Sequence, residues 1–232
     1  MGVKIGNSHT DDFNLSVTDF SITSPEVQTY SVQIPGRNGL LDLTEVNGAI
    51  RYNNRTIKIT CSHQDRTAYD YHDCSNQLLK KYHGKRRDII FDSEKDYYYS
   101  GRLFVTANKE NQVHSTYIIT ADCEPYAYEV QDRGEAWIWD SFNFRTGIIY
   151  QRDYCNISLD GTRAFIITHN GQMPVIPVFE LVSGNVSVRY NNVSYELSQG
   201  NNTIDEIIIT QNDIVTFIGS GTVTVHYRGG KL

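Results

Sequence analysis

One stretch of the chain, residues 32–61, constrains the fold most strongly. Apolar side chains alternate with polar ones over residues 30–34 and again over 57–61, which predicts strands that each present one apolar face. Pro35-Gly36 interrupts the first run with a turn signal. Asn53-Asn54 stands where a two-residue hairpin needs left-handed residues, a conformation that Asn tolerates better than most. The stretch therefore predicts three strand segments held by two turns.

Composition places the chain among folded proteins without a membrane span. The 232 residues fit one large or two small domains, and 39% hydrophobic with 21% charged residues is not a disordered composition. No apolar run approaches the roughly 18 residues of a spanning helix, and the N-terminus has no apolar core of a secretory signal. The net charge is −6. We therefore predict neither membrane association nor specific nucleic-acid binding.

A change of period marks one helix in the first half of the chain. From Asp65 onward, apolar residues recur at steps of three and four up to Tyr82, the pattern of an amphipathic helix. Asp65 is predicted to be its N-cap and Gly84 its C-terminal stop. Strand patterns precede and follow this helix. Residues 1–130 are therefore predicted to form one α+β domain, a sheet with one helix on it.

Beyond a polar segment near residues 127–134 the sequence shows strand patterns only. Turn residues separate short apolar runs every eight to twelve positions, which predicts a β-sandwich over residues 131–232. The predicted strands are 136–139, 147–150, 156–159, 163–168, 175–181, 186–190, 194–197, 203–210, 213–218 and 222–227. Arg-Tyr-Asn-Asn occurs at 51–54 and again at 189–192. We interpret the two copies as the same hairpin turn used twice.

The sequence offers little for catalysis or for metal binding. Cys61-x-His63 and His72-x-Cys74 supply four candidate zinc ligands, but residues two apart on a helix point about 200° apart. No nucleophile elbow and no phosphate loop is present. The cysteines Cys61, Cys74, Cys123 and Cys155 show no paired spacing, which favours buried free thiols and assembly in a reducing cytoplasm. We predict no catalytic residue, no cofactor and no metal.

Trp137 and Trp139 are the only tryptophans and lie two residues apart, hence on one face of a predicted strand. Such a pair can form an aromatic platform for a sugar ring. A sandwich also needs large inward side chains at this spacing, so core packing or a contact between domains explains the pair as well. Both interpretations remain open.

Several motifs, taken in order, resemble those of the distal tail proteins of long-tailed bacteriophages. They cover roughly the first 130 residues. The matching segments are Pro35-Gly36-Arg37-Asn38-Gly39, Leu41-Asp42-Leu43-Thr44-Glu45, Tyr52-Asn53-Asn54-Arg55, His83-Gly84-Lys85, Tyr98-Tyr99-x-Gly101-Arg102 and Asp122-Cys123-Glu124-Pro125-Tyr126. The C-terminal half is similar to the galectin-like sandwich that follows the ring domain in many of these proteins.

The resemblance implies a structural protein of the virion rather than an enzyme. It implies a hexameric ring of this chain, able to stack, that joins the tail tube protein to the tip or lysin protein and to receptor-binding proteins. The residues expected at ring contacts are Gly36, Arg37, Gly39 and Arg55, with the arginines pairing with carboxylates or pinning the hairpins within one domain. The alternative function is a carbohydrate-binding module that recognises cell-wall sugar through Trp137 and Trp139.

Overall fold

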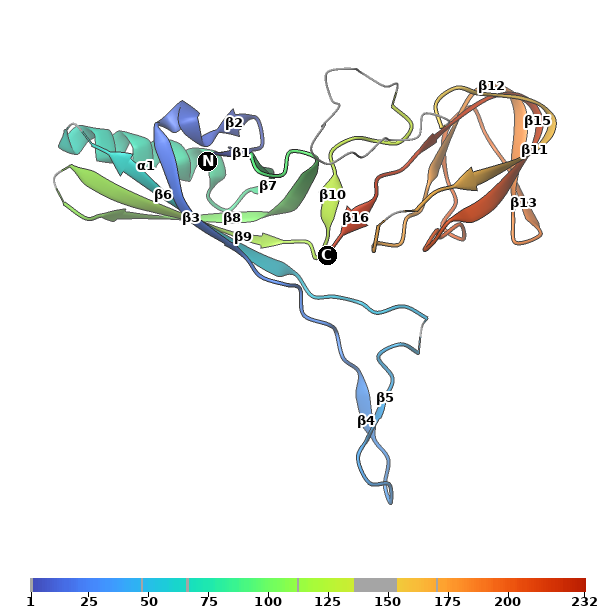
Figure 1. The fold of residues 1–232 in the computed structure, drawn as a ribbon, viewed down its shortest axis with the longest axis horizontal. Coiled ribbons are helices and arrows are strands. Elements are labelled where there is room, and N and C mark those ends of the chain that lie inside the picture. Colours follow the sequence, from blue (N-terminus) through green and yellow to red (C-terminus); the bar gives the residue numbers. More distant parts are fainter. Residues whose placement is uncertain (1, 47, 66, 112, 136–153, 170) are drawn as a thin grey trace. The chain divides into compact units, whose positions relative to one another are not determined.

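The computed structural model describes residues 2–46, 48–65, 67–111, 113–135, 154–169 and 171–232. The chain forms two compact units, Met1–Ala127 together with Leu232 (unit 1) and Tyr128–Lys231 (unit 2). Antiparallel strands dominate both units, and α1 (Ala68–Tyr82) is the one α-helix among the described residues (Figure 1). The predicted mainly β fold with one helix is confirmed. No helix in the described part of the chain could span a membrane by its length and apolar character.

Unit 1 is built on an antiparallel sheet with the strand order β2, β1, β7, β8, β9, β6, β3. Its strands are β1 (Val3–Ile5), β2 (Ser8–His9), β3 (Leu15–Ile22), β6 (Arg55–Gln64), β7 (Arg86–Phe91), β8 (Tyr97–Lys109) and β9 (His114–Cys123). A short 3₁₀ helix, η1 (Thr10–Phe13), joins β2 to β3. In β6 every second side chain from Arg55 to His63 is buried. The strand predicted over 57–61 is therefore confirmed, with one apolar face.

Helix α1 begins at a capping box that sequence reasoning placed two residues too early. Thr67 is the N-cap: its hydroxyl accepts from the Asp70 N–H, and the Asp70 carboxylate accepts from the Thr67 N–H. The predicted N-cap Asp65 is wrong, because its carboxylate is occupied by partners in the sheet. Gly84 follows the C-cap residue with φ +73°, so the predicted stop is confirmed.

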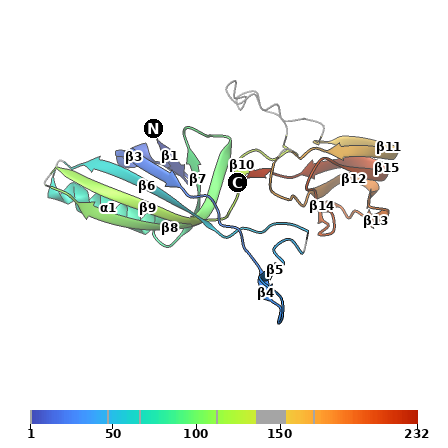
Figure 2. The ribbon, with the colours of Figure 1, turned by 60° about the horizontal axis from the view of Figure 1, so that its bottom comes forward.

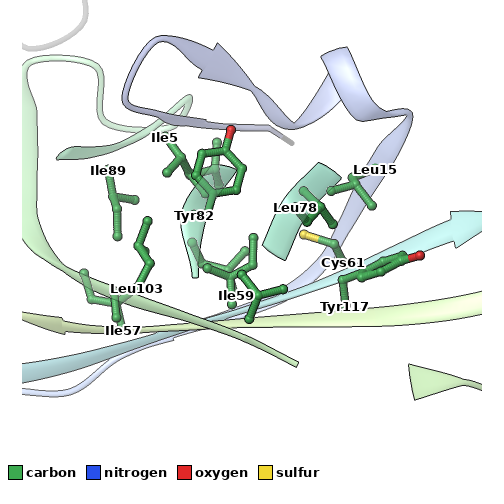
Figure 3. Close-up of a cluster of buried hydrophobic side chains, with 14 of the residues drawn as sticks. Ile5, Leu15, Ile57, Ile59, Cys61, Leu78, Tyr82, Ile89, Leu103 and Tyr117 are labelled. Atoms are coloured by element: carbon green, nitrogen blue, oxygen red, sulfur yellow. The ribbon is translucent and has the colours of Figure 1, made fainter. Parts of the chain in front are cut away.

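The core of unit 1 lies between α1 and the sheet. Cys74, Leu78 and Tyr82 form the buried stripe of the helix. All three belong to one core cluster with Ile57 and Ile59 of β6 and with inward side chains of the neighbouring strands. Figure 3 shows Leu78 and Tyr82 in this cluster. The three- and four-residue steps in the sequence therefore correspond to the face that α1 turns to the sheet.

A long hairpin, here called the arm (residues 23–54), connects β3 to β6. It contains its own two-stranded sheet, β4 (Ser31–Gln33) and β5 (Leu40–Asp42), separate from the main sheet in both views (Figures 1 and 2). The Asn53 N–H donates to the Glu26 carbonyl at 2.8 Å, and neither Asn53 nor Asn54 has a positive φ. The hairpin turn predicted at Asn53-Asn54 is therefore wrong, because these residues lie in the returning segment of the arm that leads into β6.

Unit 2 contains one sheet with the order β11, β15, β12, β13, and β14 also pairs with β12. The strands of this sheet are β11 (Ile157–Ile167), β12 (Val178–Tyr190), β13 (Val193–Glu196), β14 (Gly200–Thr203) and β15 (Asp213–His226). The short strands β10 (Ala127–Glu129) and β16 (Gly230–Lys231) pair with each other and are not part of it. The long strands β11 and β12 bury side chains near both ends and expose the middle. All of these buried side chains meet in one core, as in a β-sandwich.

Three of the predicted strand pairs in this unit are single continuous strands. Residues 156–159 and 163–168 are both in β11, 175–181 and 186–190 are largely in β12, and 213–218 and 222–227 are largely in β15. Glycines cause the error: Gly184 and Gly221 stand opposite each other in mid-strand, and a Cβ on Gly184 would lie 2.2 Å from the Ser220 carbonyl oxygen. They mark a close approach within the sheet, and sequence reasoning interpreted them as turns.

Candidate assembly surface

The arm carries large apolar side chains that are exposed to solvent rather than packed in a core. Its exposed large apolar residues are Val27, Tyr30, Val32, Ile34, Leu40, Val46 and Ile50. Leu40 is 60% exposed and Val46 is 69% exposed. Apolar side chains concentrated in this way on one element are typical of a surface that associates with another protein. The arm is therefore the candidate functional site of unit 1.

Polar contacts, rather than a core, hold the two sides of the arm together. The Leu43 N–H donates to the Tyr30 carbonyl at 2.7 Å, and the Tyr30 N–H donates to the Thr44 hydroxyl at 3.1 Å. Thr44 in turn donates its hydroxyl and its N–H to the Asp42 carboxylate, and these two bonds lower the pKa of Asp42. The arm therefore keeps a defined strand pairing while its apolar side chains stay exposed.

The tip of the arm contains three of the residues that the sequence marked. Gly36 has φ +82° and Gly39 has φ +80°, values that favour glycine, and a Cβ on either would meet nothing within 4 Å. The Arg37 N–H donates to the Ile34 carbonyl at 3.1 Å and closes the turn. The Arg37 side chain is exposed and has no ion pair among the described residues. The structure brings these three together at the tip and separates them from Arg55.

Arg55 lies where the arm joins the sheet and is buried. Only 4% of the residue is exposed, and its guanidinium carbon lies 5.6 Å from the centroid of the Tyr99 ring. Its Nε and Nη2 atoms have no hydrogen-bond partner among the described residues. A guanidinium is always protonated, so the fold keeps a positive charge here with two unpaired N–H groups.

Asp65, just beyond the other end of β6, is a buried charge with many partners. Its carboxylate lies 2.7 Å from the His63 Nδ1 and 3.2 Å from the Ser115 hydroxyl, and it forms an ion pair with Lys109. Burial raises the pKa of Asp65, but the hydrogen bonds from Lys109, His63 and Ser115 outweigh that effect and bring it below its ordinary value. Sequence reasoning took Asp65 for a helix cap and missed this role.

A pocket of about 750 Å³ in unit 1 includes residue types that also occur in catalytic sites. His63, Asp73 and Cys74 contribute to its lining. Burial raises the pKa of the Cys74 thiol, so this cysteine is not activated as a thiolate nucleophile. No group of three or more metal-ligating side chains is found in the described part of the chain.

The cysteine prediction is confirmed for three thiols. Cys61, Cys74 and Cys123 are free and buried, whereas Cys155 is half-buried. Burial raises the pKa of Cys61 and of Cys123 to about 12, which keeps both thiols protonated. These cysteines therefore act as small apolar core residues.

Unit 2 contains a buried arginine whose charge is paired. The Arg133 Nε donates to the Glu129 Oε2 at 3.0 Å, and its Nη2 donates to the Glu129 Oε1 at 2.7 Å. The Gly229 N–H donates to the same carboxylate at 3.1 Å. Sequence reasoning missed this pair, because four-residue spacing indicates a contact only on a helix and Glu129 ends strand β10. Trp137 and Trp139, the predicted sugar or domain contact, lie outside the described residues.

Comparison with known proteins gives a family match and a fold match. Residues 2–117 match the family model described as a phage tail protein RIFT-related domain. The fold is similar to the crystal structure of SPP1 Dit (gp 19.1), titled a paradigm of the hub adsorption apparatus in phages that infect Gram-positive bacteria, with TM-score 0.62 and 10% identity. That similarity covers 100% of this chain and 99% of the other. No curated protein matches.

Proposed function

The chain belongs to the phage tail protein family with the RIFT-related domain, and we propose that it is the distal hub of the tail. A member of this family is a structural component of the virion, and the whole chain has the fold of a distal tail protein. In the proposed role, copies of the chain form a ring that joins the tail tube to the tip, lysin or receptor-binding proteins. The ring is assembled in the host cytoplasm.

The arm is the observation that carries this proposal. Its apolar side chains are exposed in one copy, as described above, and a neighbouring copy would bury them. The arm and the surface that receives it are different parts of the chain, so the contact is heterologous. Heterologous contacts close into rings when the rotation between copies allows it.

Gly36, Arg37, Gly39 and Arg55 remain the proposed contact residues. Gly36 and Gly39 set the backbone of the tip, which determines where the exposed Arg37 side chain meets a partner. The Arg37 side chain has no partner in its own copy among the described residues, so it is available for an ion pair with a carboxylate of a neighbouring copy. Residues 1–130 thus form the proposed ring domain and residues 131–232 the proposed galectin-like domain.

A non-enzymatic role is part of the proposal. The described thiols of the core are kept protonated by burial, and the pocket beside α1 lacks an activated nucleophile. A structural protein that acts by associating with other proteins needs neither a reactive thiolate nor an activated nucleophile.

The experiment is a measurement of the assembly state of the full chain by native mass spectrometry, with and without tail tubes. We expect the wild type to form closed rings, by itself or on tubes. The variant Leu40→Ser/Val46→Ser should stay a single copy with an unchanged melting temperature, because both side chains are exposed in the single copy.

A matched control separates the arm from general surface polarity. Ile166 and Ile214 in unit 2 are each 57% exposed, close to the exposure of Leu40, so the double variant Ile166→Ser/Ile214→Ser removes a similar apolar surface outside the arm. Rings should persist in this variant. A wild type that remains single at high concentration and does not bind a tail tube would refute the hub, and equal effects of the two double variants would refute the arm.

A further inference from the structure

The guanidinium of Arg55 lacks a partner along one particular edge. The unpaired atoms are Nε and Nη2, which share one edge of the planar guanidinium. That edge presents two parallel N–H groups at the spacing of the two oxygens of a carboxylate. Tyr99 lies beside Arg55: its ring attracts the charge, and its hydroxyl forms a side-chain hydrogen bond with Arg55. A single hydroxyl cannot make the bidentate bond that a carboxylate makes.

The same chain shows what this edge binds when a partner is present. Arg133 is equally buried, and its Nε and Nη2 hold both oxygens of Glu129 at 3.0 and 2.7 Å. Arg55 and Arg133 therefore present the same two atoms in the same buried setting. One has its carboxylate and the other does not.

We propose that Arg55 is a buried receptor for a carboxylate supplied by a second copy of this chain. The inference rests on the proposed function, because the proposed ring would place another copy beside Arg55, where the arm joins β6. A buried charge without a partner is costly in a single copy, and it is retained at little net cost when assembly always provides the partner. The buried guanidinium of Arg55 is therefore unpaired in the single copy and paired in the proposed ring.

The arm itself offers suitable donors of the carboxylate. Glu26 and Glu45 are both exposed, and neither has a side-chain hydrogen bond or ion pair among the described residues. Arg55 directly follows the arm in the sequence, and the proposal requires that the arm shift on assembly so that the Nε/Nη2 edge becomes accessible. The receptor and its proposed ligands thus belong to the same association surface.

Two substitutions with opposite expected effects test the proposal. Arg55→Met removes the unpaired charge and keeps the volume, so the melting temperature of the single copy should stay equal or rise. The dissociation constant for self-association should rise by about 30-fold or more, the usual consequence of removing one partner of a buried charge pair. Arg55→Lys keeps the charge without the bidentate edge and should weaken association as well.

Arg133→Met is the matched control, because it breaks a pair that the single copy already has. Its melting temperature should fall by about 6 °C or more. If Arg55→Met also lowers the melting temperature, or leaves self-association unchanged, Arg55 is an ordinary structural residue and the proposal is wrong. A wild type that never associates refutes the hub instead, and is recognised before any variant is measured.

Acetate distinguishes a free carboxylate from that of a second copy. In sodium acetate, compared with sodium chloride at equal ionic strength, the wild type should associate more weakly and Arg55→Met should not respond. Glu26→Gln or Glu45→Gln should weaken association in the wild type and add nothing in Arg55→Met. If acetate raises the melting temperature while both glutamine variants associate like the wild type, the site takes a free carboxylate and the second-copy assignment is wrong.

Discussion

Strand β6 has a buried charge at each end, and the fold treats the two in opposite ways. Asp65, just beyond its last residue, is held by His63, Lys109 and Ser115. Arg55, its first residue, leaves two N–H groups unpaired. The Asp65 end leads to the helix that closes the core, whereas the Arg55 end leads to the exposed arm. The difference is in line with the proposed assembly, in which another copy would complete the arm end of β6.

Replacing Asp65 by Asn tests the finished end, and the largest loss of stability is expected there. The substitution leaves Lys109 and His63 around a neutral amide in a buried site. Breaking a buried ion pair in this way lowers the free energy of unfolding by about 3–5 kcal/mol. Urea denaturation at pH 7 measures it. A loss under about 1 kcal/mol would mean that the two ends of β6 do not differ as described.

The same variant has a defined pH dependence. The pKa of Asp65 in the fold lies below its ordinary value of 3.8. A depressed pKa stabilises the fold fully above the unfolded value, and this contribution is lost as the pH falls through the folded value. The difference between wild type and Asp65→Asn should therefore be full at pH 7 and shrink as the pH falls below 3.8. A difference that stays constant would refute the charge as its origin.

Ile59→Ala and Ile34→Ala sharpen the comparison between sheet and arm. Both isoleucines belong to alternating runs, but Ile59 is fully buried under α1 and Ile34 is 39% exposed on the arm. Ile59→Ala should lower the free energy of unfolding by about 2–5 kcal/mol, because it leaves a cavity. Ile34→Ala should change it by no more than about 0.5 kcal/mol. Similar losses in the two variants would show that the arm packs against its own copy.

These two isoleucines also show how much of the structure could be predicted from the sequence. The period-two alternation correctly predicted strands in both runs, since it reports how side chains alternate across a strand. It could not show which face another element covers, because that depends on where α1 lies. The apolar face of β6 is buried and that of the arm is exposed, although their sequence patterns are alike.

The repeated segment Arg-Tyr-Asn-Asn makes the same point for turns. At 189–192 its two asparagines have φ +48° and +66° and form the predicted turn between β12 and β13. At 51–54 the same residues run along the arm, where the Gln28 N–H donates to the Arg51 carbonyl at 2.8 Å. Asparagine permits a left-handed turn without requiring it. Whether the chain turns at these asparagines depends on the segment that pairs with them. The paired Arg133 and the unpaired Arg55 could not be told apart from sequence for the same reason.

Gly101→Ala and Gly36→Ala give the smallest expected difference between the two regions. Gly101 in β8 stands opposite Cys123, the residue that faces Arg55 on the next strand. A Cβ there would lie 2.5 Å from the Cys123 sulfur and from the Asp122 carbonyl oxygen, an overpacking that costs about 2 kcal/mol. Gly36 faces open space, so alanine adds only the strain of its positive φ, about 1 kcal/mol. Thermal unfolding measures the two losses of stability, and Gly101→Ala should lose more. Ring formation should show the opposite order, because Gly36→Ala alters the tip of the arm that is proposed to meet a neighbouring copy. If Gly36→Ala forms rings as well as Gly101→Ala does at a temperature where both are folded, the shape of the tip does not matter for association.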